Sequence, residues 1–197
     1  AFYDCTGELT INCNIPNVSY PDNRVFYGAK FTCITIGDSV TTIGDYAFSS
    51  CNNLTNVTIS DSVTTIGRQA FYNCSSLERV NIGSGVTMIG VEAFSGCTGE
   101  LIINCDIPYN SFYGAKFASV TIGDNVVTIG DKGFYYLNSI TLVTIGDSVT
   151  TIGDDAFYNC SSLTSITIPD SVITIGDEAF YSCNNLTSVT IGDGVNT

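Results

Sequence analysis

The chain has 197 residues, of which 44% are hydrophobic and only 13% charged, so it can bury a core but must build much of its surface from uncharged polar side chains. Its formal net charge of −13 argues against nucleic acid and anionic lipid as partners, because both attract basic surfaces. The chain contains no histidine, which excludes Ser-His-Asp and Cys-His nucleophile systems, and no apolar stretch approaches the roughly 18 residues that a membrane-spanning helix needs.

One sequence unit recurs along the whole chain. It reads Leu-x-x-Val-x-Ile, then Gly-Asp-Ser-Val, Val-x-x-Ile-Gly and Asp-x-Ala-Phe-x-x-Cys. The position of the central apolar residue of the first segment rises by 23 from each unit to the next, except for a step of 17 from Ile103 to Val120. A fixed period of this size predicts a solenoid, here a right-handed one of nine units. The nine central residues are Ile11, Ile34, Val57, Val80, Ile103, Val120, Val143, Ile166 and Val189.

Each unit begins with a predicted strand and a predicted turn. Ile166 and Ile168 alternate with Ser165 and Thr167, which predicts a strand with one apolar and one polar face. Equivalent strands run in the same direction, so they are expected to form one parallel sheet. Gly-Asp-Ser-Val has the composition of a turn, and Val-x-x-Ile-Gly predicts a short half-buried extended segment.

The unit ends with Asp-x-Ala-Phe-x-x-Cys, which predicts one helical or 3₁₀ turn with the aspartate as its N-cap. The recurring phenylalanine predicts a column of stacked rings in the core. The predicted N-caps are Asp45, Asp131, Asp154 and Asp177, and the predicted ring column comprises Phe2, Phe48, Phe71, Phe94, Phe134, Phe157 and Phe180.

Two units depart from this pattern. Residues 5–16 are nearly repeated as residues 97–108, and both stretches lead to Phe-Tyr-Gly-Ala-Lys-Phe, at residues 26–31 and 112–117. The first copy has a longer stretch in between, outside the strand, so residues 17–25 are predicted to form a protruding loop.

The repeated frame Leu-x-x-Val-x-Ile…Val-x-x-Ile-Gly-x-x-Ala-Phe-x-x-Cys resembles the BspA-like leucine-rich repeats, and the variant Cys-Thr-Gly-Glu-Leu units resemble those of Bacteroides-type gut bacteria. The resemblance implies a curved solenoid with a parallel sheet on its concave side. It also implies a bacterial protein that is secreted or displayed on the cell surface, in some members for adhesion to host matrix proteins or other cells. It supplies no catalytic residues and no cofactor. Residues 1–197 are expected to form one such domain and to be a fragment of a longer chain, because both ends lack capping units.

The chain has nine cysteines, and most of them recur at one position of the unit. Adjacent coils place these side chains parallel to one another, which matches disulfide torsions poorly, although a cystine or a metal ladder stays an alternative. We expect buried free thiols at Cys51, Cys74, Cys97, Cys160 and Cys183, with Cys5 in the same column and Cys13 and Cys105 at strand positions. Cys33 is predicted to be an exposed thiol on the outward face of its strand.

Aspartates also form columns, which indicate turns and caps in the first place and a divalent cation as the alternative. One column is the predicted N-cap column. The other consists of Asp38, Asp61, Asp124, Asp147, Asp170 and Asp193 and is interrupted by Ser84.

Two surfaces are candidates for binding a partner. The first is the outward face of the sheet, whose small hydroxyl residues give way to larger ones at Arg79, Ile102 and Leu142. Its predicted residues are Asn56, Thr58, Arg79, Asn81, Ile102, Asn104, Ser119, Thr121, Leu142 and Thr144, followed by Ser165, Thr167, Ser188 and Thr190. The second is a tyrosine column beside the phenylalanines, comprising Tyr72, Tyr135, Tyr158 and Tyr181, with Tyr3 at its start.

The pattern therefore predicts a non-catalytic scaffold that recognises a protein or a glycan at a host or microbial surface through the sheet face. One alternative is a structural spacer that carries another domain away from the cell surface. A second alternative is an ice-binding surface built on the column Thr35, Thr58, Thr121, Thr144, Thr167 and Thr190.

Overall fold

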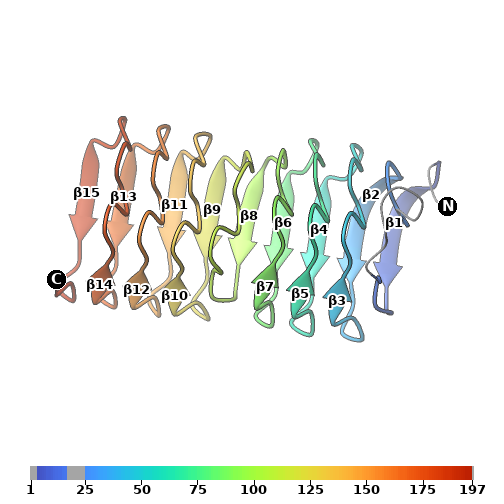
Figure 1. The fold of residues 1–197 in the computed structure, drawn as a ribbon, viewed down its shortest axis with the longest axis horizontal. Coiled ribbons are helices and arrows are strands. Elements are labelled where there is room, and N and C mark those ends of the chain that lie inside the picture. The colour runs from blue at the N-terminus through green and yellow to red at the C-terminus, as the bar shows by residue number, and fades with distance from the viewer. Residues whose placement is uncertain (1–3, 17–24, 197) are drawn as a thin grey trace.

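The computed structural model describes residues 4–16 and 25–196 and shows the expected solenoid (Figure 1). The long strands lie side by side from one end of the molecule to the other, and short two-residue strands form a second layer, which lies nearer the viewer in Figure 1. The long strands are β1 (Thr6–Ile11), β2 (Lys30–Ile36), β4 (Asn56–Ile59), β6 (Arg79–Ile82), β8 (Glu100–Ile103), β9 (Ser119–Ile122), β11 (Leu142–Ile145), β13 (Ser165–Ile168) and β15 (Ser188–Ile191). The short strands are β3 (Thr42–Ile43), β5 (Thr65–Ile66), β7 (Met88–Ile89), β10 (Thr128–Ile129), β12 (Thr151–Ile152) and β14 (Thr174–Ile175).

All paired strands are parallel, and like residues of successive coils lie in register. The register shows that the predicted central residues of the two variant units, Ile11 and Ile103, are each wrong by two positions. Leu9 pairs with Ile34, and Leu101 pairs with Val120. The unit from Leu9 to Ile34 is therefore longer than the standard period. In place of the single short unit that the sequence predicted, the units before and after Leu101 are both moderately short. A shift of two positions leaves every side chain on the same face, so the alternation of the sequence could not detect it.

The rear segment of each coil is not helical, contrary to the sequence-based expectation, and the described part of the chain contains no helix. Gln69 and Asn73 instead have positive φ angles of 50° and 57°, and the equivalent residues of other coils do the same. The backbone N–H groups of Gln69, Phe71 and Asn73 donate to carbonyls of the next coil, whereas the N–H of Tyr72 donates to the Gln69 carbonyl of its own coil. This alternation ties neighbouring coils together, whereas a helix would direct its hydrogen bonds along its own axis.

The aspartate columns are hydrogen-bonded ladders between coils, and the predicted N-caps are wrong because no helix follows them in the described residues. Oδ1 of Asp154 accepts the backbone N–H of Asp177 at 2.8 Å, and Oδ1 of Asp61 accepts the N–H of Ser84 at 2.7 Å. The same bond joins Asp131 to Asp154 at 3.0 Å. These three carboxylates therefore each accept a backbone N–H one coil away, and charge-assisted bonds of this kind are among the stronger ones in proteins.

The core contains the predicted column of phenylalanine rings. Phe71 stacks between Phe48 and Phe94 with centroid distances of 5.1 and 5.3 Å. The two variant units contribute Phe26 and Phe112, which the repeat pattern did not assign to the column. Phe2 lies outside the described residues. The column runs through every coil that the structure describes fully, so the variant motif Phe-Tyr-Gly-Ala-Lys-Phe replaces the standard one without interrupting the core.

The cysteines of the repeated position are free and buried, as predicted. Each thiol also has a polar role, because Sγ of Cys74 donates to the Phe48 carbonyl of the preceding coil at 3.1 Å and its equivalents make the same contact. A hydrogen bond to the Cys74 thiol, followed by burial, raises the pKa of Cys51 far above its ordinary range. Hydrogen bonding and burial also raise the pKa of Cys160, so the thiols of Cys51 and Cys160 are unreactive parts of the core.

The predictions for the first coil are wrong, because Cys5 and Cys13 are exposed. The first coil is packed against a described neighbour on one side only, whereas Cys105, the equivalent of Cys13, is buried between the coils of β6 and β9. Cys33 lies on the outward face as predicted and is half-buried.

Cys105 is expected to make the solenoid less stable at alkaline pH. Burial, and secondly the adjacent Asp106 carboxylate, raise the pKa of the Cys105 thiol to about 12. The native state therefore holds this proton at pH values where the unfolded chain, with an ordinary thiol pKa, has already released it. The contribution of the protonated Cys105 thiol to stability is fully present below the pKa of this thiol in the unfolded chain, and it is lost as the pH rises toward 12. We expect the free energy of unfolding, measured by urea titration, to decrease between pH 8.5 and 11, by at most about 1.4 kcal/mol per pH unit for this group. A Cys105→Ala variant should show a shallower decrease than wild type.

Candidate binding face

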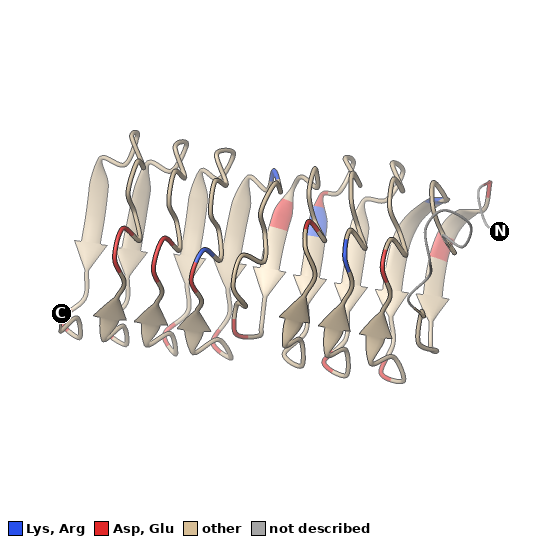
Figure 2. Ribbon diagram, in the orientation of Figure 1, with Lys and Arg blue, Asp and Glu red and all other residues tan. Residues whose placement is uncertain are grey.

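The outward residues of the long strands form two columns on one face of the sheet. Figure 2 shows that this face carries little charge, since most of its strands contain no Lys, Arg, Asp or Glu. Asn81 and Ile102 interrupt the threonine column, so the face lacks the unbroken hydroxyl lattice of the ice-binding alternative. The first column contains Glu8, Cys33, Asn56, Arg79, Glu100, Ser119 and Leu142, and the second contains Thr10, Thr35, Thr58, Asn81, Ile102, Thr121 and Thr144.

One predicted residue of the face is misplaced as a consequence of the register shift. The sequence pattern pairs Ile102 with Asn104, but the outward residues of β8 are Glu100 and Ile102. Asn104 follows the strand, and its Nδ2 donates to Oδ1 of Asn81 and to the Ile82 carbonyl, both at 3.2 Å. Asn104 therefore belongs to the edge of the face, and Glu100 takes the place predicted for Ile102.

The larger residues do interrupt the hydroxyl surface at the predicted places. Arg79 forms an ion pair with Glu100, with Nη2 to Oε2 at 2.9 Å and Nε to Oε2 at 3.0 Å. The Arg79 side chain is still 60% exposed, and that of Glu100 is 32% exposed. Leu142 is 54% exposed, which is unusual for a leucine on a sheet built from serine and threonine. An ion pair and an exposed aliphatic side chain thus stand on an otherwise uniform face.

Between β11 and β13 the sheet is split, and sequence analysis did not anticipate this. The front ladder runs from β1 to β11 and stops, and β13 pairs only with β15 among the described strands. Behind the split the short strands β12 and β14 remain paired. The core is partly uncovered there, since Val143 and Ile145 are 5% and 8% exposed while Val120 and Ile122 of the preceding strand are each 1% exposed.

Pro169 lies at the end of the strand where the front ladder is interrupted. In most coils the residue after the strand donates its N–H to the preceding strand, as Gly192 does to the Ile168 carbonyl at 2.9 Å and Ser60 to the Ile36 carbonyl at 3.2 Å. Gly146 makes no such bond, and β11 still pairs with β9. Proline has no N–H, so the bond from residue 169 cannot form. Other coils have glycine, serine or asparagine at this repeat position, so the proline is the feature of the sequence that coincides with the split.

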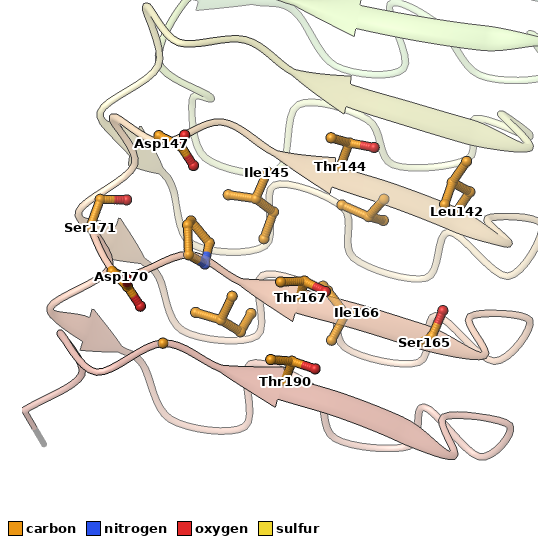
Figure 3. A pocket seen from close by; sticks show the side chains of 14 residues that line it. Leu142, Thr144, Ile145, Asp147, Ser165, Ile166, Thr167, Asp170, Ser171 and Thr190 are labelled. Carbon is orange, nitrogen blue, oxygen red and sulfur yellow. The ribbon is translucent and has the colours of Figure 1, made fainter.

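A groove of about 770 Å³ lies over the split (Figure 3). Leu142 and Ser165 stand at one end of it, and Asp147, Asp170 and Ser171 gather at the other end, beyond the strands. Thr144, Thr167 and Thr190 lie along the outward side. The groove therefore combines hydroxyl groups, a partly uncovered apolar floor and an acidic end, with no lysine or arginine among its described lining residues.

The tyrosine surface lies on the opposite side, over the rear segments. Tyr158 stacks with Tyr135 and Tyr181, each at 5.1 Å between ring centroids, whereas Tyr72 lies apart from this group along the chain. Tyr136 joins the group, at 4.6 Å from Tyr135, and was not predicted. Loss of solvent contact raises the pKa of Tyr135 and Tyr158, so both hydroxyls remain protonated at neutral pH. Because the rings cover one another, the surface offers ring edges and hydroxyls and few open ring faces.

A family comparison matches this architecture. Residues 1–100 and 105–197 match the BspA type leucine rich repeat region, in six copies. The chain belongs to the BspA type leucine-rich repeat family. The parallel strands and their regular spacing along the sequence are the structural form of that repeat in this chain.

The chain is similar to several solved structures, one of which has a TM-score above 0.5. A leucine-rich repeat protein from Eubacterium ventriosum is 22% identical, with a TM-score of 0.52 over 93% of this chain and 67% of that protein. A leucine-rich repeat protein from Bacteroides ovatus is 25% identical, with a TM-score of 0.46 over 86% of this chain and 57% of that protein. A leucine rich cell surface protein from Faecalibacterium prausnitzii is 26% identical, with a TM-score of 0.37 over 82% of this chain and 60% of that protein. The chain thus spans only part of the length of each of these proteins.

A search among curated proteins found no match. Within residues 4–16 and 25–196 no helix has the length and hydropathy that crossing a membrane requires.

Proposed function

We propose that this BspA type repeat is a non-catalytic recognition scaffold that binds a protein or a glycan at a host or microbial surface through its sheet face. One observation carries the proposal: a long, flat and nearly uncharged face of small hydroxyl residues is interrupted by the Arg79–Glu100 ion pair, Ile102 and Leu142. Arginine is enriched among the side chains that dominate binding energy in protein interfaces, and an exposed aliphatic side chain offers apolar area that a partner can bury.

The repeat architecture supports a binding role. Each coil contacts only its neighbours, so side chains of one kind are spread along the face in columns. The absence of histidine from the sequence and the distribution of like carboxylates along the coils support a scaffold without a catalytic centre. Location outside the cell is part of the same proposal and is supported by the family. An antibody against this chain should label intact producing cells, and labelling only after lysis would contradict that location.

The test is a binding screen of the folded chain against immobilised matrix proteins and glycans, followed by substitution of the anchors. The variant Arg79→Thr, Ile102→Thr, Leu142→Thr should bind its partner at least about tenfold more weakly, because the central anchors of an interface carry most of its energy. The matched control Thr58→Ser, Thr167→Ser, Thr190→Ser changes three residues of the same face while keeping their hydroxyls and should bind as wild type does.

The alternative is a spacer that holds another domain away from the cell surface. It predicts that the folded chain binds nothing above background and that the triple threonine variant retains every function of the parent protein. A variant with unchanged affinity for an identified partner would exclude the anchors as the binding site and favour this alternative.

A further inference from the structure

We propose that the second variant unit forms a separate binding site, on the tyrosine surface, that takes one neutral sugar ring. This site lies on the opposite side of the solenoid from the sheet face and does not depend on the function proposed for that face. It is a pocket of about 190 Å³ whose lining consists of Tyr109, Asn110, Tyr113, Lys132 and Tyr135.

The variant unit brings a tyrosine to a repeat position that carries aspartate in the coils that follow. Residues 108–112 align with the Gly-Asp-x-x-Phe segment of the next coil, so Tyr109 stands where that coil has Asp131. The Ser111 hydroxyl is buried and donates to the Pro108 carbonyl at 2.6 Å. This bond fixes the turn that carries Tyr109, so that side of the pocket is held in place before a ligand arrives.

Hydrogen bonds between coils place two polar residues of the pocket side by side. The N–H of Asn110 donates to the Asp131 carbonyl at 3.1 Å, and the N–H of Lys132 donates to the Asp154 carbonyl at 2.9 Å. These bonds are equivalent, so Asn110 and Lys132 hold the same position in adjacent coils, and both have positive φ angles, of 53° and 57°. The Asn110 carboxamide forms no hydrogen bond within the described residues, which leaves its donors and its acceptor for a ligand.

Lys132 is the one cationic residue in the described lining of the pocket. Its Nζ atom lies 5.4 Å from the ring centroid of Tyr135 and 6.0 Å from that of Tyr109. It also lies 3.8 Å from Oδ2 of Asp155. An ammonium group has three N–H donors, so this one long contact leaves donors that a ligand can use. The Asp155 carboxylate balances the charge of Lys132, and the pocket therefore does not favour an anion.

Tyr109 and Tyr113 are the uncovered aromatic rings of the pocket. They are 65% and 45% exposed, and neither stacks on another ring within the described residues. By contrast, Tyr158 in the later coils is covered by Tyr135 and Tyr181, each at 5.1 Å between ring centroids. The face of a phenol ring is negative and attracts the positively polarised C–H groups of a flat ligand.

Together these groups favour a pyranose as the ligand. Such a sugar has a face of C–H groups that can lie against Tyr109 and a rim of hydroxyl groups that can pair with Asn110 and Lys132. A carboxylated sugar is less suitable, because Asp155 already balances Lys132 and the chain has a formal net charge of −13. A purely aromatic ligand would leave the donors of Asn110 and Lys132 unpaired.

The experiment measures saturation-transfer NMR of the methyl glycosides of glucose, galactose and mannose with the folded chain. We expect at least one glycoside to bind with a Kd of about 1 mM, as suits a ligand of this size, and to show its strongest signals on the C–H protons of one ring face. Tyr109→Ala should weaken this binding roughly threefold to tenfold, because it removes the stacking surface. Tyr109→Phe keeps the ring and should bind within about twofold of wild type.

Asn110→Gly tests the polar side of the pocket. Glycine accepts the positive φ angle at this position, so the variant removes the carboxamide without straining the backbone. We expect glycoside binding to weaken roughly threefold to tenfold, the value of a lost hydrogen bond. Tyr181→Ala is the matched control, because Tyr181 is an exposed tyrosine of the same surface outside the pocket, and it should leave binding unchanged. The triple threonine variant of the sheet face should also bind the glycoside as wild type does.

The inference is overturned if none of the three glycosides binds at up to roughly twenty times the expected Kd, or if wild type and Tyr109→Ala bind equally. Tighter binding of methyl glucuronide would overturn it too, because the pocket would then select an anion. If Tyr109→Ala does not fold, Asn110→Gly and the comparison with the glucuronide decide the question. Loss of glycoside binding in the triple threonine variant would move the site to the sheet face, in which case this inference falls and the proposed function stands.

Discussion

Replacing Phe71 by alanine should destabilise the solenoid by about 3–5 kcal/mol, the range measured for the removal of a buried phenylalanine side chain. Phe71 is fully buried, and its ring is covered on both sides by Phe48 and Phe94 at interplanar angles of 17° and 5°. The cavity cannot collapse easily, because hydrogen bonds between coils hold the two neighbouring rings in their own coils. The measurement is the urea or thermal unfolding transition of the variant against wild type.

The neighbouring Tyr72 provides the control for this prediction. It is exposed and lies outside the ring column of the core, so Tyr72→Ala should change the free energy of unfolding by roughly 0.5 kcal/mol or less. A loss below about 1 kcal/mol for Phe71→Ala would show that the ring column is not the main source of stability. Because each coil contacts only its neighbours, the transition of the variant is also expected to broaden as the two halves begin to unfold separately.

The second large effect is expected for Gly90→Ala. Gly90 lies at a repeat position where the chain passes close to the coil before it, and a Cβ atom there would stand 2.5 Å from the Arg68 nitrogen and 2.6 Å from the Gly67 carbonyl carbon. These are backbone atoms, which cannot rotate away. The N–H of Gly90 also donates to the Ile66 carbonyl at 2.8 Å, so the coils must separate and lose that bond. We expect a destabilisation of about 1–3 kcal/mol or more, as for other overpacked sites.

The control for Gly90→Ala is Ser84→Ala in the same coil. Ser84 is exposed, and its backbone N–H donates to Oδ1 of Asp61 through an atom that the substitution keeps, so the variant should be within about 0.5 kcal/mol of wild type. Comparable unfolding midpoints for Gly90→Ala and Ser84→Ala would mean that the coils can shift apart without cost. The idea that glycine sets the spacing between coils would then be wrong.

Together the split and the anchors divide the sheet face into two parts. The Arg79–Glu100 pair and Ile102 lie on the strands before β9, whereas Leu142 marks the beginning of the groove over β11 and β13. A partner that covers the whole face would meet both parts.

Much of the fold could be predicted because the same pattern of apolar, polar and aromatic residues recurs in each repeat. Alternation of Ile166 and Ile168 with Ser165 and Thr167 is enough to assign the faces of a strand, and the recurrence of Phe48, Phe71 and Phe94 is enough to place a ring column. In a stack of coils, residues one period apart must become neighbours, so periodicity translates directly into contacts.

Sequence by itself determined the solenoid, the inward and outward faces, the buried cysteine column and the places where Arg79, Ile102 and Leu142 interrupt the sheet face. Only the tertiary structure decided the register of Leu101, the left-handed residues such as Gln69 in the rear turns, the pairing of Arg79 with Glu100 and the split at Pro169. The physical reason is that a strand can slide by two positions without changing faces, and a backbone N–H can bond within its coil or across to the next. Both choices depend on contacts with the neighbouring coil, and the sequence of a single unit does not show those contacts.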